Sequence, residues 1–245
     1  MNQRQLNPGL ILLGMGTGTV LRDSAGTNAS PGPSIDEVIA DFQTPGKQGR
    51  LFIISGPSGV GKTTIVNRLL VHYNTPPREL VFIVSHTTRP MRPGDENGVD
   101  YHFDTEEEFH QVQSIGGFLE TAVVHGNFYG TPKKPVMDAL QRGADVIVDI
   151  DVQGWCRIKR YDFGAGVPQI HSIFIKPETT EQLRMQLLER GDSPDVIARR
   201  VTAAEKEIAR ANEYDHVVIS HFGHPDRALA EVMEIFEGIH GSISS

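Results

Sequence analysis

The residues with the clearest chemical meaning are a glycine-rich stretch that follows a short apolar run. Residues 56–64 read GPSGVGKTT, which fits the pattern G-x-x-x-x-G-K-[ST], directly after LFIIS at residues 51–55. A buried strand, a glycine-rich turn and a helix in this order form a loop whose amides bind a polyphosphate. Gly56 and Gly61 suit the turn because glycine takes its dihedral angles at little cost. The segment therefore predicts a nucleoside triphosphate site.

Each part of this loop has an expected task. Lys62 is expected to reach the β and γ phosphates, and the Thr63 hydroxyl is expected to complete the shell of a Mg²⁺ ion. The amides from Gly59 to Thr64 converge on phosphate oxygens at the start of the helix. The residues expected to bind the ATP phosphates are Gly56, Pro57, Ser58, Gly59, Val60, Gly61, Lys62, Thr63 and Thr64.

A second group of residues suits a phosphomonoester. The stretch SHTTRPMRPGD at residues 85–95 carries two arginines, Arg89 and Arg92, in a loop that prolines stiffen. Guanidinium groups bind a phosphate bidentately, and tyrosine hydroxyls such as those of Tyr101 and Tyr129 close the shell. A buried carboxylate such as that of Glu120 accepts from the N1–H and the exocyclic amine of guanine, a donor pair that adenine lacks.

Two acids are expected at the end of a third strand. Asp149 and Asp151 follow the apolar run VIV at residues 146–148. Because they alternate on a strand, both side chains project from one face of the sheet end. This position is typical of a Walker-B-type acid that faces the nucleotide.

The elements that must position these residues alternate along the chain. Short β-branched strands between helices predict an α/β fold, with a parallel sheet covered on both faces. Residues 86–131 interrupt the alternation with a polar and aromatic insert, which predicts a lobe beyond the carboxyl ends of the strands. Strands are expected at 51–55, 80–85, 145–150, 171–175 and 217–219, and helices at 62–72, 135–142, 154–161, 178–190, 195–212 and 225–239.

The first part of the chain differs from the rest in composition. Residues 1–48 are rich in Gly, Ser, Pro, Asn and Thr, which predicts a mostly disordered extension with a short helix at 34–42. The remaining residues, 49–245, are expected to form one domain.

Composition restricts the partners and the compartment. The net charge of −8 disfavours nonspecific binding to nucleic acid, and no apolar run reaches the length of a membrane span. A single cysteine, Cys156, excludes an intrachain disulfide and fits a reducing compartment, so we expect a cytoplasmic protein. A site for phosphorylated small molecules must gather its cations locally.

Several blocks in order carry a resemblance to a known family. Residues 50 to about 240 resemble guanylate kinase, a P-loop nucleoside monophosphate kinase that moves a phosphoryl group from ATP to GMP. The resemblance implies a P-loop NTPase doubly wound sheet, a GMP-binding lobe at 85–131, a helical lid at 183–200, and ATP and Mg²⁺. The matching blocks are GPSGVGKTT, SHTTRPMRPGDENGVDYHF, FLETAVVHGNFYGTP, VIVDIDVQG and RGDSPDVIARRV.

The resemblance also implies a task for individual residues. Guanine is expected to contact Ser85, Thr131 and Asp151 beside Glu120, and Asp149 is expected near Mg²⁺, through water. The GMP phosphate is expected to lie among Arg89, Arg92, Tyr101 and Tyr129. The expected catalytic residues are Lys62, Arg89, Asp149 and two lid arginines, Arg190 and Arg200.

The chain departs from the family's pattern in three places. Gln186 stands where the family usually has a lid arginine, four residues before Arg190, and the lid turn is one residue short. Asp95 replaces the usual glutamate. Residues 219–224, ISHFGH, stand where the family usually shows Asn-Asp near the adenine, which leaves the donor selectivity open.

Two other functions remain open from the sequence. One is a noncatalytic guanylate-kinase-like binding module; such modules tend to lose the phosphate-loop lysine and the guanine contacts, whereas Lys62 and Glu120 are present here. The other is a related P-loop kinase for another phosphorylated acceptor. Ser85 together with Glu120 favours guanine over that alternative.

Overall fold

The computed structural model describes residues 49–73, 79–164 and 167–241. The predicted extension at residues 1–48, with its helix at 34–42, lies outside the described residues. The strands are β1 (Leu51–Ser55), β2 (Leu80–Phe82), β3 (His86–Thr87), β4 (His102–Phe103), β5 (Phe118–Val124), β6 (Asn127–Pro132), β7 (Asp145–Asp149), β8 (Ile170–Pro177) and β9 (His216–Ser220). The helices are α2 (Lys62–Tyr73), α3 (Glu106–Ser114), α4 (Lys133–Gln141), α5 (Val152–Ile158), α6 (Thr180–Glu189), α7 (Pro194–Ile208), the 3₁₀ helix η1 (Ala211–Glu213) and α8 (Pro225–Gly241).

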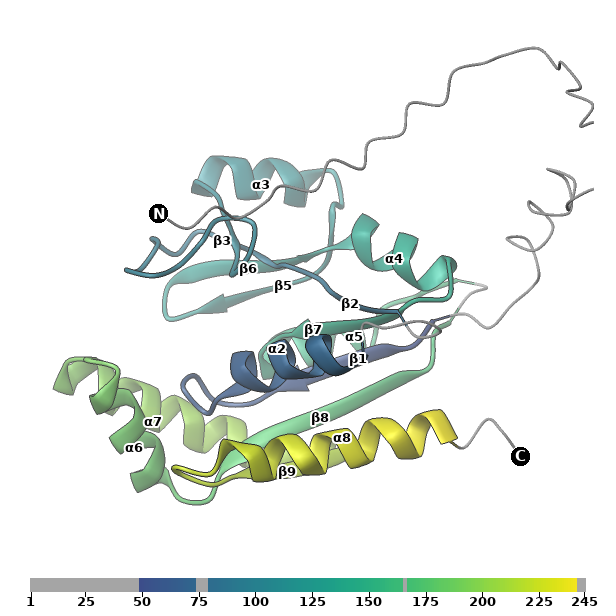
Figure 1. The fold of residues 1–245 in the computed structure, drawn as a ribbon. Helices are drawn as coiled ribbons and strands as arrows, with labels where there is room; N and C mark the ends of the chain where they lie inside the picture. Colours follow the sequence, from purple (N-terminus) through teal and green to yellow (C-terminus); the bar gives the residue numbers. More distant parts are fainter. Residues whose placement is uncertain (1–48, 74–78, 165–166, 242–245) are drawn as a thin grey trace, which may run out of the picture. The chain divides into compact units, whose positions relative to one another are not determined.

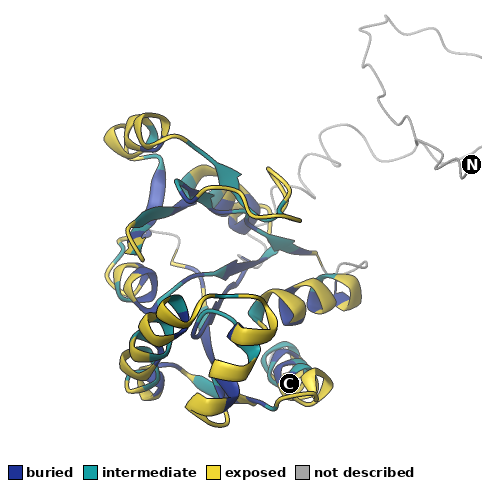
Figure 2. Ribbon diagram, turned by 90° about the vertical axis from the view of Figure 1, so that its left-hand side faces the viewer, coloured by how far each residue is buried: buried dark blue, intermediate teal, exposed yellow. Residues whose placement is uncertain are grey.

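The central sheet has the order β2-β7-β1-β8-β9, and all its neighbouring strands run parallel (Figure 1). Its middle strand, β1, is buried along its whole length. Leu51 and Ile53 pack with α4 and α5, whereas Phe52 and Ile54 pack with α2 and α8, because successive side chains of a strand point to opposite faces. Buried residues accordingly follow the strands and the inner sides of the helices (Figure 2). The predicted doubly wound α/β fold is confirmed.

The insert forms a second sheet of order β4-β3-β6-β5, which carries α3. β5 and β6 are an antiparallel hairpin, and β3 pairs with β6 on its other side. The predicted strand at residues 80–85 was wrong at its end. The amide of Ile83 still donates to Ile147 (N–O 3.1 Å), and the chain then leaves the central sheet to begin β3.

Helices α6 and α7 form a hairpin with a small apolar core of its own, made of Leu183, Leu187, Ile197 and Ala204. Gly191 has a φ of +85° in the turn that joins them, a conformation that glycine adopts without strain. The predicted helix at 195–212 ends earlier, at Ile208, and η1 follows it. None of the helices in the described part of the chain combines the length and the apolar character that a membrane crossing requires.

Candidate active site

A cavity of about 410 Å³ lies where the carboxyl ends of the central strands, the second sheet and α7 meet. It brings together most of the site residues that the sequence predicts. Those that line it are Gly56, Ser58, Gly59, Lys62, Thr63, Ser85, Arg89, Arg92, Tyr101, Glu120, Tyr129, Asp149, Asp151, Arg190 and Arg200. The predicted residues that do not line it are Pro57, Val60, Gly61, Thr64 and Thr131.

The phosphate loop joins β1 to α2 and keeps its lysine close to the turn. The Nζ atom of Lys62 donates to the backbone oxygens of Gly56 (2.7 Å) and Pro57 (3.2 Å). Gly56 has a φ of +145°, and a Cβ atom there would stand 2.0 Å from the backbone oxygen of Ile175. No residue with a side chain fits this position, so the approach of the loop to β8 depends on glycine.

Asp149, the last residue of β7, lies beside the lysine. Its Oδ1 atom is 3.7 Å from Nζ of Lys62. Burial raises the pKa of the Asp149 carboxyl, and the nearby ammonium of Lys62 opposes this rise. Thr63 lines the same wall, so an oxygen-only donor set of the kind that Mg²⁺ prefers faces the cavity. No group of three or more metal-ligating side chains occurs among the described residues.

Four arginines from distant parts of the chain line the cavity: Arg89, Arg92, Arg190 and Arg200. Burial lowers the pKa of Arg92, and the other three guanidinium groups lower it further. Burial likewise lowers the pKa of Arg200, although Asp192, whose Oδ2 atom lies 2.7 Å from its Nη1, opposes this change. In a chain with a net charge of −8, this concentration of cations marks a binding site for anions.

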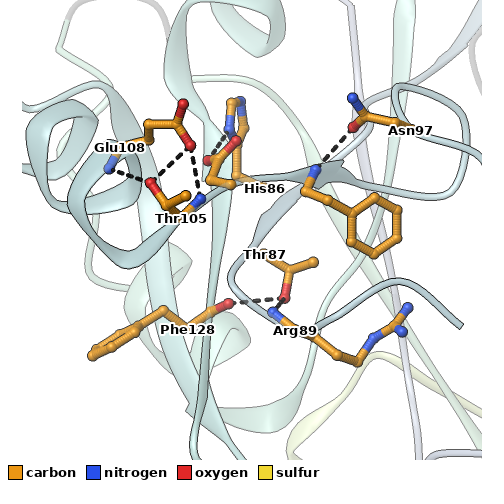
Figure 3. A network of polar contacts seen from close by, with 9 residues as sticks. His86, Thr87, Arg89, Asn97, Thr105, Glu108 and Phe128 are labelled. Atoms are coloured by element: carbon orange, nitrogen blue, oxygen red, sulfur yellow. Dashed lines mark hydrogen bonds and ion pairs between the residues drawn. The ribbon is translucent and has the colours of Figure 1, made fainter.

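Arg89 is held by its surroundings before any phosphate binds. Its side chain is only 8% exposed, and its Nη1 atom lies 2.9 Å from Oδ2 of Asp95, the residue that replaces a glutamate. Its guanidinium group lies 5.4 Å from the ring centre of Tyr101 and 5.3 Å from that of Phe103. The Thr87 hydroxyl accepts from the backbone N–H of Arg89 and donates to the backbone oxygen of β6 residue Phe128, at 3.2 and 2.9 Å (Figure 3).

At the other end of the cavity, one carboxylate is half satisfied. Glu120 is 6% exposed, and its Oε1 atom accepts a 2.7 Å hydrogen bond from the Thr131 hydroxyl. Its Oε2 atom is buried and has no hydrogen-bond partner among the residues that the structure describes. Burial raises the pKa of Glu120 to about 7, against the opposing effect of Thr131. A buried acceptor without a donor costs roughly 1–3 kcal/mol, which a ligand with N–H groups would relieve.

The second acid after β7 lies at the start of α5. Asp151 caps this helix: its Oδ1 atom accepts from the Gly154 amide (2.9 Å), and its Oδ2 atom accepts from the side chain of Gln153 (3.0 Å). Burial raises its pKa. Its carboxylate therefore has a fixed position in the wall of the cavity.

Some residues that line the cavity were not predicted from the sequence, namely Asp100, His125 and Glu207. Glu207 lies seven residues after Arg200 on α7, which is two helical turns, so the helical period alone would have placed both on one face. Burial raises the pKa of Glu207 to about 7, and the charge of Lys62 opposes that rise. Asp100 and His125 lie in turns, where no period predicts the direction of a side chain.

The structure shows the contacts of the residues that depart from the family's usual pattern. Gln186 does not line the cavity, and its Oε1 atom is buried without a partner among the described residues. The Ser220 hydroxyl donates to the backbone oxygen of Val60 (3.0 Å), which ties β9 to the phosphate loop. His221 pairs with Glu178, with Nδ1 and Oε2 3.1 Å apart.

A parallel doubly wound sheet, a phosphate loop between its central strand and a helix, and a facing pocket rich in arginines define a P-loop nucleotide-binding protein. The chain belongs to the guanylate kinase family, because the profile of the family guanylate kinase matches residues 48–238.

Individual relatives agree with this assignment. The chain is 44% identical over 174 residues to a guanylate kinase of Photobacterium profundum, a match that covers 71% of this chain and 80% of the relative. It is 43% identical over 175 residues to one of Streptococcus agalactiae, with the same coverage of 71% and 80%. It also resembles the crystal structure of guanylate kinase from Anaplasma phagocytophilum. The TM-score is 0.63 at 30% identity, over 78% of this chain and 86% of that one.

Proposed function

We propose that this protein transfers the γ-phosphoryl group of ATP to GMP, giving ADP and GDP. The observation that carries the proposal is that Lys62 of the phosphate loop and the half-satisfied carboxylate of Glu120 line one cavity, together with four arginines. A donor at the loop and an acceptor base at Glu120 would thus face each other. Membership of the guanylate kinase family supports the same reaction.

The acceptor would be held at both ends. Arg89, Arg92, Tyr101 and Tyr129 would bind the GMP phosphate, since two guanidinium forks and two hydroxyls suit a dianion. Guanine would donate its N1–H and its exocyclic amine to Glu120. Ser85, Thr131 and Asp151 would bound the rest of the base within the lobe of residues 85–131.

Phosphoryl transfer requires alignment and neutralisation of charge rather than a covalent intermediate. Lys62 would bind the β and γ phosphates, while Arg190 and Arg200 would approach the transferred group from the lid at residues 183–200. A Mg²⁺ ion held by Thr63 and, through water, by Asp149 would supply further positive charge. A closed lid would exclude water, which otherwise competes with GMP as acceptor.

The composition of the chain supports small-molecule partners in a reducing compartment. Because the chain has a net charge of −8 and a single cysteine, we propose that the protein acts on free nucleotides in the cytoplasm and binds neither nucleic acid nor a membrane.

The test is ADP release from ATP and Mg²⁺ with GMP, AMP, CMP or UMP as acceptor. We expect turnover with GMP and less than about one hundredth of it with the other three, since a site built to accept two adjacent hydrogen bonds rejects bases that lack the N1–H and amine pair of guanine. Lys62→Ala should abolish turnover. Equal ADP release with and without GMP would refute the proposal. GMP binding without any turnover would favour a binding module, and preference for another acceptor would favour a related kinase.

A further inference from the structure

The first turn of α5 passes unusually close to the carboxylate of Glu120. A Cβ atom at Gly154 would stand 2.6 Å from Oε2 and 2.9 Å from Cδ of that carboxylate, and 3.2 Å from Cβ of Ile150. A methyl carbon and an oxygen atom, which form no hydrogen bond, do not approach to 2.6 Å unless one of them is displaced. The backbone of Gly154 is helical, not left-handed, and alanine is the better helix former there. The reason for a glycine at this position therefore lies in the space it leaves.

Glu120 has little freedom to give way. It is 6% exposed, and the Thr131 hydroxyl holds its Oε1 atom at 2.7 Å from the facing strand. Glu120 and Thr131 are register partners in the β5–β6 hairpin, so their backbones are fixed to each other as well. A methyl group at residue 154 would have to push the free oxygen, Oε2, away from α5. That oxygen is the one of the two carboxylate oxygens that has no hydrogen-bond partner in the described part of the chain.

The glycine is itself held firmly. Its amide donates to Oδ1 of Asp151 at 2.9 Å, which caps α5. One turn of helix thus sets two carboxylates in the cavity wall. It orients Asp151 by donating to it, and it admits Glu120 by having no side chain.

We propose that Gly154 is a positioning residue for recognition of the acceptor base: its missing side chain lets the Glu120 carboxylate stand against α5, with Oε2 directed to the N–H groups of guanine. This inference rests on the proposed function. The contact lies on the acceptor side, since the three heavy atoms nearest to the position of the missing Cβ atom belong to Glu120 and Ile150. A change at residue 154 should therefore act on the acceptor alone.

The test is Gly154→Ala, assayed for ADP formation with the full chain. We expect the KM for GMP to rise about tenfold to a hundredfold, the effect of losing a hydrogen bond to a charged group. The KM for ATP and the kcat at saturating GMP should stay within about twofold. Gly238→Ala in α8 is the matched control, because nothing lies within 4 Å of the Cβ atom it would gain. It should leave all three values unchanged. A KM for GMP that also stays unchanged in Gly154→Ala would overturn the proposal.

A double-mutant cycle with Glu120→Ala separates positioning from a general effect on the fold. Once the carboxylate is gone, the methyl group at residue 154 loses its two closest contacts, so Glu120→Ala/Gly154→Ala should match Glu120→Ala in its KM for GMP. A further rise in the double variant would overturn the inference. The comparison holds even if Gly154→Ala alone folds poorly, since the double variant keeps only the 3.2 Å contact with Cβ of Ile150, which a shift of a few tenths of an ångström relieves. Wild-type protein without GMP-dependent turnover would instead refute the proposed function.

Discussion

At the residue scale, burial in the cavity disfavours ionisation of the Glu120 carboxyl group, whereas a bound guanine would favour it. Burial raises the pKa of Glu120 to about 7; Thr131 and Arg157 lower it, and Asp151 raises it further. A protonated carboxyl accepts less well than a carboxylate, and guanine presents two donors. GMP should therefore bind the ionised form and release a proton near neutral pH.

This argument predicts how the KM for GMP depends on pH. Below pH 7 most of the free protein carries a protonated Glu120, which must lose its proton for GMP to bind, so affinity increases as the pH rises through 7. We expect a KM for GMP about tenfold higher at pH 6 than at pH 8, from initial rates at saturating ATP. The GMP phosphate itself titrates near pH 6. Glu120→Gln measures that background, and an equal dependence in this variant would contradict the assignment.

At the scale of elements, α6 carries an uncharged residue, Gln186, at a position from which a longer basic side chain could reach the cavity. Gln186 lies one turn before Arg190, which lines the cavity, and two residues one turn apart share a helix face. We expect Gln186→Arg to raise kcat by about threefold to tenfold, because a further cation near the transferred group stabilises its developing charge. Gln186→Leu fills a similar volume without charge and should leave kcat unchanged. Steady-state rates at saturating substrates decide this, and an equal response of the two variants would exclude an effect of charge.

Elements also differ in how well the sequence predicts them. Amphipathic helices such as α2 and α8, and apolar strands such as β1, can be predicted from the pattern of hydrophobic residues in their own sequence. The two-residue strands β3 and β4 have no period, and only their pairing with β6 and with each other defines them. The same holds in the site. The phosphate loop and the arginines are visible in the sequence, whereas the distance between Gly154 and Glu120 arises only when α5 packs on β5.

At the scale of the whole domain, the end of the sheet opposite the cavity is closed by a buried ionic contact. The carboxylate of Asp145, the first residue of β7, accepts from the Arg50 amide (2.9 Å) and lies 2.8 Å from Nε2 of His240 in α8. The other ring nitrogen of His240 lies 2.6 Å from the backbone oxygen of Phe236. Both ring nitrogens of His240 thus have a polar partner in the folded domain. The contact fastens the last helix to the two central strands.

Loss of this contact should cost stability without affecting catalysis. Asp145→Asn should lower the free energy of unfolding by about 2–3 kcal/mol at pH 6, because it leaves the buried guanidinium of Arg50, whose Nε lies 3.3 Å from Oδ1 of Asp145, without its anion. Asp138→Asn, which breaks an exposed pair with Lys134, is the matched control and should cost less than about 0.5 kcal/mol. Both should keep the wild-type kcat, since Asp145 and Asp149 stand at opposite ends of β7, about 13 Å apart.

The difference in unfolding free energy between wild type and Asp145→Asn should depend on pH if the charge of Asp145 causes it. Burial alone would raise the pKa of Asp145, but the hydrogen bonds from His240 and Arg50 outweigh burial and hold it below its usual value. A carboxyl with a depressed pKa stabilises the folded state above its unfolded pKa of about 3.9, and this stabilisation disappears as the pH falls through the folded value. In urea unfolding, the gap between wild type and Asp145→Asn should therefore stay constant from pH 6 to about pH 4 and narrow below it. A gap that persists unchanged at pH 3 would mean that packing, not charge, holds α8 in place.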